Sequence, residues 1–129
     1  MEPVITNYSL RSSGHYVPAI KHNGLVYVSG QLSVDPETGQ VVPGGIKAEV
    51  RQALLNMERV LKAAGTDKSN VIHCRLYIAD VAYWSELNEV YAEFFGGHKP
   101  ARAVVPSGSL HYGCLVEIEA IAACEGGAQ

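Results

Sequence analysis

The sequence lacks the features that mark membrane, secreted and nucleic-acid-binding proteins. No apolar run approaches the ~20 residues that a membrane-spanning helix needs. The chain of 129 residues carries 10 basic and 13 acidic side chains, a net charge of −3, and has no Lys/Arg cluster suited to a phosphate backbone. Its first residues contain neither the basic nor the apolar segment of a secretory signal. We therefore expect a cytoplasmic protein that has no membrane partner and for which nucleic acid is a poor candidate partner.

Cysteines are few and are not arranged as a disulfide framework. Cys74, Cys114 and Cys124 are odd in number and show no C-x-x-C spacing, which favours reduced thiols. His111 and Cys114 form one isolated H-x-x-C, whereas zinc sites with four ligands usually show two such pairs. The sequence thus predicts no metal site.

The composition and the local sequence patterns suit one globular domain over residues 1–129. The apolar fraction is 47% and the charged fraction 18%, both ordinary for a domain of this length. Residues 16–20 and 25–29 suit short strands, and Asn23-Gly24 between them is a strong signal for a two-residue hairpin turn. A second turn is expected at 35–39, where the sequence reads D-P-E-T-G.

Two helices are expected from apolar residues spaced three and four apart. The first lies between Gly45 and Gly65, and the second covers 84–95 after an expected N-cap at Asp80. The simplest interpretation makes Trp84 and Phe94 part of the core of the second helix.

Residues 70–78 alternate like a strand, and two more strands are expected after Pro100. One face of 70–78 is apolar and should lie under the helices; it contains Ile72, Cys74, Leu76 and Ile78. The other face mixes polar and apolar side chains; it contains Val71, His73, Arg75 and Tyr77. The order ββ-α-β-α-ββ predicts an α+β fold with both helices on one face of a mixed sheet, and we expect another subunit to cover the opposite face.

Arg102 and Glu117 are the candidate functional residues because each lies in an apolar, strand-like stretch, 100–106 and 114–123. Charges in such settings need compensation from each other, from a ligand or from a subunit boundary. A symmetric antiparallel hairpin would set the two side chains opposite each other, with Cβ atoms ~5 Å apart.

Two interpretations of the Arg102–Glu117 pair follow from the chemistry alone. Arginine holds carboxylates in two parallel hydrogen bonds and an ionised Glu can orient water, so the pair could form a small-acid site. In that setting the positive charge should keep Glu117 ionised, which favours water orientation and proton acceptance over acid donation. The alternative is a structural ion pair at an interface, which residue chemistry by itself favours.

Motifs along nearly the whole chain resemble one family. They are G-H-Y at 14–16, V-S-G-Q at 28–31, D-P-E-T-G at 35–39, R-Q-A-L-L-N-M at 51–57, N-E-V-Y at 88–91, H-K-P-A-R at 98–102 and V-E-I-E-A-I-A at 116–122. In this order and spacing the chain resembles the Rid family, also called YjgF/YER057c/UK114. The resemblance implies a chorismate-mutase-like fold and a homotrimer with clefts between subunits.

The same resemblance implies an activity that needs no cofactor. Members hydrolyse 2-imino acids and their enamine tautomers to 2-keto acids and ammonia. By this likeness Arg102 holds the carboxylate of the substrate and Glu117 positions the attacking water. The remaining implied contacts are Tyr16, Ser29 and Gly30 in the cleft wall, the backbone N–H of Val104, and Asn88 close by.

The chain departs from the common family pattern at several of these places. His15 stands where many deaminating members have Pro, Pro18 replaces a frequent Gln or His, and Val104 replaces Cys or Thr. The stretch V-P-S-G-S at 105–109 also differs, which leaves the identity of the ligand open. Two other function classes therefore stay under consideration: a non-catalytic sensor that binds small carboxylates such as 2-keto acids, and a ribonuclease or chaperone-like protein, which the missing basic stripe disfavours.

Overall fold

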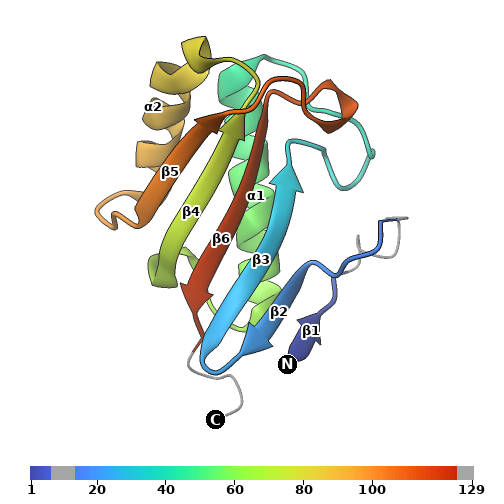
Figure 1. The fold of residues 1–129 in the computed structure, drawn as a ribbon, viewed down its shortest axis with the longest axis vertical. Coiled ribbons are helices and arrows are strands. Elements are labelled where there is room, and N and C mark those ends of the chain that lie inside the picture. The colour runs from blue at the N-terminus through green and yellow to red at the C-terminus, as the bar shows by residue number, and fades with distance from the viewer. Residues whose placement is uncertain (7–13, 125–129) are drawn as a thin grey trace.

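Two helices pack on one face of a six-stranded sheet in the computed structural model, which describes residues 1–6 and 14–124 (Figure 1). The strands are β1 (Glu2–Val4), β2 (Ala19–His22), β3 (Leu25–Leu32), β4 (Val71–Ile78), β5 (Ala101–Pro106) and β6 (Val116–Ala123). The helices are α1 (Ile46–Ala64) and α2 (Trp84–Phe95), and the short 3₁₀ turns are η2 (Lys68–Asn70), η3 (Val81–Tyr83) and η4 (His111–Gly113). The sheet order is β1-β2-β3-β6-β4-β5. The predicted α+β layout is confirmed, and β1 is an addition that the sequence did not predict.

The opening hairpin forms around the predicted Asn-Gly turn. Asn23 and Gly24 have φ of 52° and 77°, and His22 pairs with Leu25 across the two-residue loop. Positive φ at both central residues gives the turn the twist of the flanking strands. The strand bounds differ from the prediction, because β2 begins only at Ala19 and β3 continues to Leu32.

Helix α1 follows the predicted apolar face and ends where expected. The fully buried part of this face comprises Val50, Ala53, Leu54, Met57 and Leu61. Gly65 takes the left-handed conformation, φ 95°, and its N–H donates to the carbonyl oxygens of the last turn. Asp80 does act as an N-cap, but for η3: its Oδ1 accepts from the Ala82 N–H at 2.8 Å, one 3₁₀ turn before α2.

Strand β4 departs from the predicted alternation at its first two residues. The register against β6 shifts between Val71 and His73, so Val71 is buried and Ile72 is 47% exposed. The prediction for these two residues was therefore wrong. The irregularity places one extra residue in β4, which reverses the faces before it. From His73 to Ile78 the predicted alternation is confirmed.

The predicted C-terminal hairpin does not form. Strand β5 pairs in parallel with β4, and β6 lies between β3 and β4, antiparallel to both. Helix α2 carries the chain back along β4, which is the connection that parallel neighbours need. Val116, Ile118, Ala120 and Ala122 are buried in alternation, so a central position for β6 covers them better than an edge position would.

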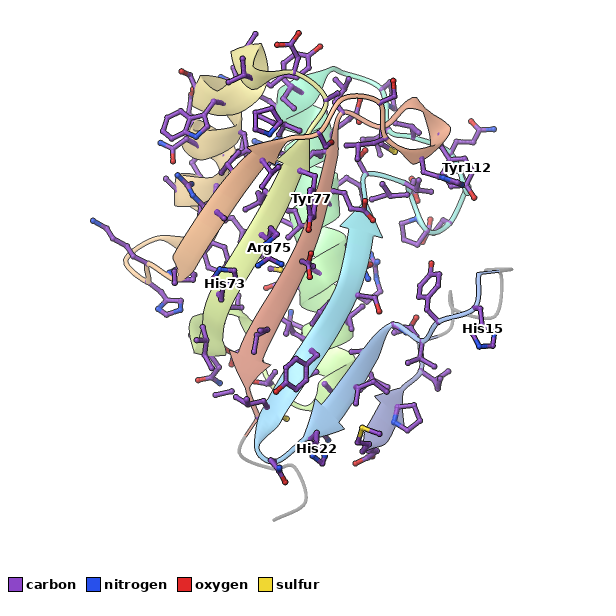
Figure 2. All side chains as sticks on the ribbon, viewed as in Figure 1. His15, His22, His73, Arg75, Tyr77 and Tyr112 are labelled. Atoms are coloured by element: carbon purple, nitrogen blue, oxygen red, sulfur yellow. The ribbon has the colours of Figure 1, made fainter. Side chains whose placement is uncertain are left out.

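The sheet face opposite the helices is uncovered in the single chain. Figure 2 shows His73, Arg75 and Tyr77 in a row along β4 on this face. Their register partners are Ile121, Glu119 and Glu117 of β6, all half-buried. Within residues 1–6 and 14–124, the structure has no helix long and apolar enough to span a bilayer.

Candidate active site in two halves

Arg102 lies on the edge strand β5 and turns toward helix α2. It is in register with the buried Cys74 of β4, so its side chain lies on the helix-covered side. Its Nη1 donates to Asn88 Oδ1 at 2.9 Å. The guanidinium carbon lies 4.8 Å from the ring centre of Tyr91 and 5.6 Å from that of Trp84. In the described part of the chain, no carboxylate forms an ion pair with Arg102.

Val104 adds a backbone donor beside Arg102. The Ser107 N–H donates to the Ile78 carbonyl at 2.8 Å, so that side of the chain faces β4. N–H groups of a strand alternate in direction, which turns the Val104 N–H three residues earlier toward the outer side of β5. The Val104 side chain packs against the core, so its apolar character suits the position. We call Arg102, Asn88 and the Val104 N–H the anchor half.

Glu117 belongs to a second group of residues on another part of the sheet. It lines a cavity of about 1040 Å³ together with Tyr16, Ser29, Gly30 and His111. The cleft wall is held in shape by the Ser29 hydroxyl, which donates to the Val17 carbonyl at 2.6 Å. We call Glu117, Tyr16, Ser29 and Gly30 the water half.

Gly30 allows Glu117 to pack against its Cα. A Cβ at Gly30 would overlap Glu117 Oε2 and lie 3.0 Å from Glu117 Cδ. A register irregularity between Val28 and Gln31 opens β3 at this point. The bulge and the missing side chain together make room for the carboxylate.

The electrostatic setting of Glu117 differs from the prediction. Burial raises the pKa of Glu117, the nearby Glu119 carboxylate raises it further, and His111 opposes the shift. The expected stabilisation of the ionised form by Arg102 is absent within the chain, since the two residues lie in different strands that do not pair. The predicted Arg102–Glu117 ion pair is therefore wrong for the single chain.

Glu119, on the same face as Glu117, is already engaged. Its Oε1 accepts from the Tyr77 hydroxyl at 2.6 Å and lies 3.5 Å from Arg75 Nη1. Glu117 forms no ion pair of this kind within the described residues. The two carboxylates thus differ in their freedom to act on a ligand.

The structure groups the predicted residues but does not bring the two groups together. In register, Arg102 shares a face with Cys74, whereas Glu117 shares a face with Tyr77. Cys74 and Tyr77 are three residues apart in one strand, so the anchor half and the water half lie on opposite faces of the sheet. One chain alone cannot apply both to one small molecule.

Sequence reasoning missed the aromatic neighbours of Arg102. Trp84 is 43% exposed and contacts the guanidinium, so its interpretation as plain helix core was wrong. Tyr91 is buried under the same guanidinium. The signal was present in the spacing of residues 84, 88 and 91, which repeats every three to four residues and marks one side of a helix. His111, considered from the sequence only as part of an isolated H-x-x-C, lines the cavity beside Glu117.

Comparison with known proteins identifies the family. The model for the family described as Endoribonuclease L-PSP matches residues 6–124. A crystal structure of a protein of the conserved Rid family from Yersinia pestis superposes with a TM-score of 0.89, at 37% identity over 95% of this chain and 98% of that chain. The chain belongs to the Rid family.

Further Rid relatives support the fold and the kind of activity. The YjgF protein of Escherichia coli has a TM-score of 0.88 at 30% identity, covering 95% of this chain and 98% of that one. The predicted chorismate-mutase-like fold is thereby confirmed. A rat protein named 2-iminobutanoate/2-iminopropanoate deaminase is 41% identical over 119 residues, which are 92% of this chain and 87% of that protein. Imine deamination is thus an activity ascribed to Rid proteins that closely resemble this chain.

Proposed function

We propose that this Rid protein hydrolyses 2-imino acids and their enamine tautomers to 2-keto acids and ammonia. The observation that carries the proposal is the state of Arg102: a half-buried cation with a single side-chain hydrogen bond and no carboxylate partner in the described chain. A guanidinium offers five N–H donors in a fork that matches a carboxylate. The carboxylate of a small acid would accept hydrogen bonds from the remaining N–H donors of Arg102, and the outward Val104 N–H would add a further donor.

The water half supplies the group that the hydrolysis needs. Glu117 accepts a proton from a water molecule while the water oxygen bonds to the electrophilic imine carbon. Glu117 passes this proton to the nitrogen of the tetrahedral adduct, which now carries a hydroxyl and an amino group. The hydroxyl then gives its own proton, through the Glu117 carboxylate, to the nitrogen as the C–N bond breaks, so ammonia leaves and the carbonyl forms. Imino acid and water are thus converted to keto acid and ammonia, with no change of oxidation state and no cofactor. Fixing the carboxylate and one water supplies rate through orientation.

Because the two halves lie on opposite faces of one chain, the proposed site needs two copies. We place the anchor half of one protomer against the water half of a neighbour in a homotrimer. The uncovered sheet face with Tyr77, Arg75 and Glu119 is the surface that a neighbour would cover. Its mixture of polar and apolar groups suits an interface better than open solvent.

Mixing two inactive variants tests the activity and the shared site together. Arg102→Ala removes the anchor and Glu117→Ala removes the base, so each homotrimer should fail to release keto acid from freshly generated imino acids. Equal amounts of the two, unfolded and refolded together, should regain roughly a quarter of the wild-type rate, since random assembly gives that share of intact sites. No recovery, with correct trimer mass by light scattering, would contradict a site shared between copies.

The assay also separates deamination from simple binding. Saturable binding of a 2-keto acid that requires Arg102, with no acceleration of imine hydrolysis, would make the protein a small-carboxylate sensor. A second candidate is RNA cleavage, which the description of the matching family model favours. Cleavage of RNA that persists in Arg102→Ala would support this alternative and place its site elsewhere.

A further inference from the structure

We propose that Tyr91 and Trp84 are positioning residues that hold Arg102 ready for a carboxylate, an inference that rests on the proposed function. Both residues belong to helix α2 and touch Arg102 rather than the reacting atoms. They act through Arg102: its side chain, which has many rotamers, is confined to one direction, and its remaining N–H donors are left for a ligand.

The geometry is that of a three-sided support. Residues 84, 88 and 91 follow one side of α2 at intervals of four and three, the spacing that aligns helical side chains. Tyr91 lies 4.8 Å and Trp84 5.6 Å from the guanidinium carbon, both within the ~6 Å range of cation–π attraction. Asn88, between them in sequence, accepts the single hydrogen bond.

Such a support explains how Arg102 can be held in place without a carboxylate partner. Arg75, which has a carboxylate partner at 3.5 Å, is held by that charge, whereas Arg102 has no such partner in the described chain. Filling its donors with a carboxylate of the protein would block the ligand. Aromatic faces attract the cation and use none of its N–H groups, so the donors stay free for the substrate.

The environment of the Tyr91 hydroxyl indicates that the aromatic ring, rather than the hydroxyl, is the group that supports Arg102. The residue is 6% exposed, and its hydroxyl makes no hydrogen bond of regular geometry among the described residues, although it interacts with the neighbouring Cys74 thiol. A buried hydroxyl that lacks a regular hydrogen bond costs desolvation free energy, so its removal is not expected to destabilise the protein. Tyr91→Phe should therefore keep the support, whereas Tyr91→Leu should remove it.

The chain offers a matched control on the same helix. Lys68 Nζ lies 4.4 Å from the ring centre of Phe94, so Phe94→Leu also removes a cation–π pair and a partly buried ring from α2. It leaves Arg102 untouched. Any general loosening of the helix should appear equally in Phe94→Leu and in Tyr91→Leu.

The experiment measures the Kd of 2-oxobutanoate by calorimetry and the KM and kcat of imine hydrolysis. Tyr91→Leu and Trp84→Leu should each weaken Kd and raise KM roughly two- to thirty-fold, with kcat little changed. Tyr91→Phe, Trp84→Phe and Phe94→Leu should bind like the wild type. If both leucine variants bind 2-oxobutanoate like Phe94→Leu, the positioning role is refuted while the deaminase proposal stands.

A spectroscopic readout covers the case in which the wild type binds no keto acid and the deaminase proposal itself fails. Aromatic faces over a guanidinium shift the NMR signals of Arg102 Nε–H and Hδ. In the ligand-free protein, those shifts should be lost in Tyr91→Leu and retained in Tyr91→Phe and Phe94→Leu. Unchanged Arg102 signals in Tyr91→Leu would overturn the inference independently of any activity.

Discussion

Replacing Gly30 by alanine should displace Glu117 with little other damage. The new methyl group would overlap Oε2 and sit 3.0 Å from Cδ and 3.4 Å from Cγ of Glu117. Ordinary contacts between carbon atoms are ~3.5–4.0 Å, so the carboxylate has to retreat by about 1 Å. A misplacement of that size costs on the order of 100-fold in rate. We therefore expect kcat/KM for imine hydrolysis to fall about 100-fold in Gly30→Ala.

Stability should change far less than activity in this variant. Pushing one side chain from its rotamer costs about 0.5–1.5 kcal/mol, which urea unfolding would detect as a modest shift. Gly97→Ala is the matched control, because Gly97 has no positive φ and an added Cβ would meet nothing within 4 Å. It should leave both kcat/KM and the unfolding free energy near wild type.

A double-mutant cycle tests whether the clash with Glu117 causes the loss of unfolding free energy in Gly30→Ala. In a Glu117→Ala background the carboxylate is gone, so adding Gly30→Ala should no longer cost unfolding free energy. Full activity of Gly30→Ala, or an equal stability loss in both backgrounds, would refute the packing argument and with it the placement of Glu117.

Four further outcomes follow from Glu117, Cys74 and Glu49. Because Glu117 must be ionised to accept a proton, kcat/KM should fall as pH drops through the raised pKa of Glu117. Glu119→Gln removes one cause of the raised pKa, so this fall in kcat/KM should occur at lower pH in the variant. A fall at the same pH as in the wild type would show that Glu119 does not raise the pKa of Glu117. Relative to Glu117→Gln, the unfolding free energy should decline as pH rises through the same pKa, because the folded state holds that proton more tightly. Burial raises the pKa of Cys74 to about 11, so iodoacetamide at pH 8 should label this thiol only after unfolding in urea; rapid labelling in the folded state would argue against its burial. Glu49 is buried and accepts a hydrogen bond from the Leu115 N–H at 2.8 Å, just before β6. Glu49→Ala should therefore lower the unfolding free energy measured in urea by about 1–3 kcal/mol. A loss below ~0.5 kcal/mol would show that this contact is dispensable.

Elements whose signals are local were predictable from the sequence. Helix α1 has a continuous apolar face and a glycine at its end, and the Asn23-Gly24 turn determines its own hairpin. Each of these depends on neighbours within a few residues, where spacing and φ preferences decide the outcome.

The pairing of the last strands was not predictable in the same way. Arg102 and Glu117 are near in sequence, and a hairpin is the simplest link between their strands. Instead, β6 pairs with β3 and β4, where its alternate residues are buried, and no hairpin with β5 forms. This pairing places Arg102 and Glu117 on opposite faces of the sheet. The irregularity at Ile72 is a second nonlocal effect, since it is set by register against β6 rather than by β4 itself.

The sequence proposes a set of candidate site residues, whose roles stay a prediction, but it did not predict their arrangement. Family motifs pointed to Arg102, Glu117 and their neighbours, and the structure groups them into an anchor half and a water half. The aromatic support of Arg102 depends on how α2 lies over β5, which no periodicity in either element specifies alone. Packing between elements therefore carries the information that the sequence pattern leaves out.

Both outer strands of the sheet carry a proline, and this limits how copies of the protein can aggregate. Pro3 lies in the three-residue β1 at one edge, and Pro106 ends β5 at the other. Neither can donate a backbone hydrogen bond to an added strand, so growth of the sheet into open-ended fibrils is discouraged at each border. The trimer that we propose uses the sheet face instead, where assembly can close on itself rather than continue without limit.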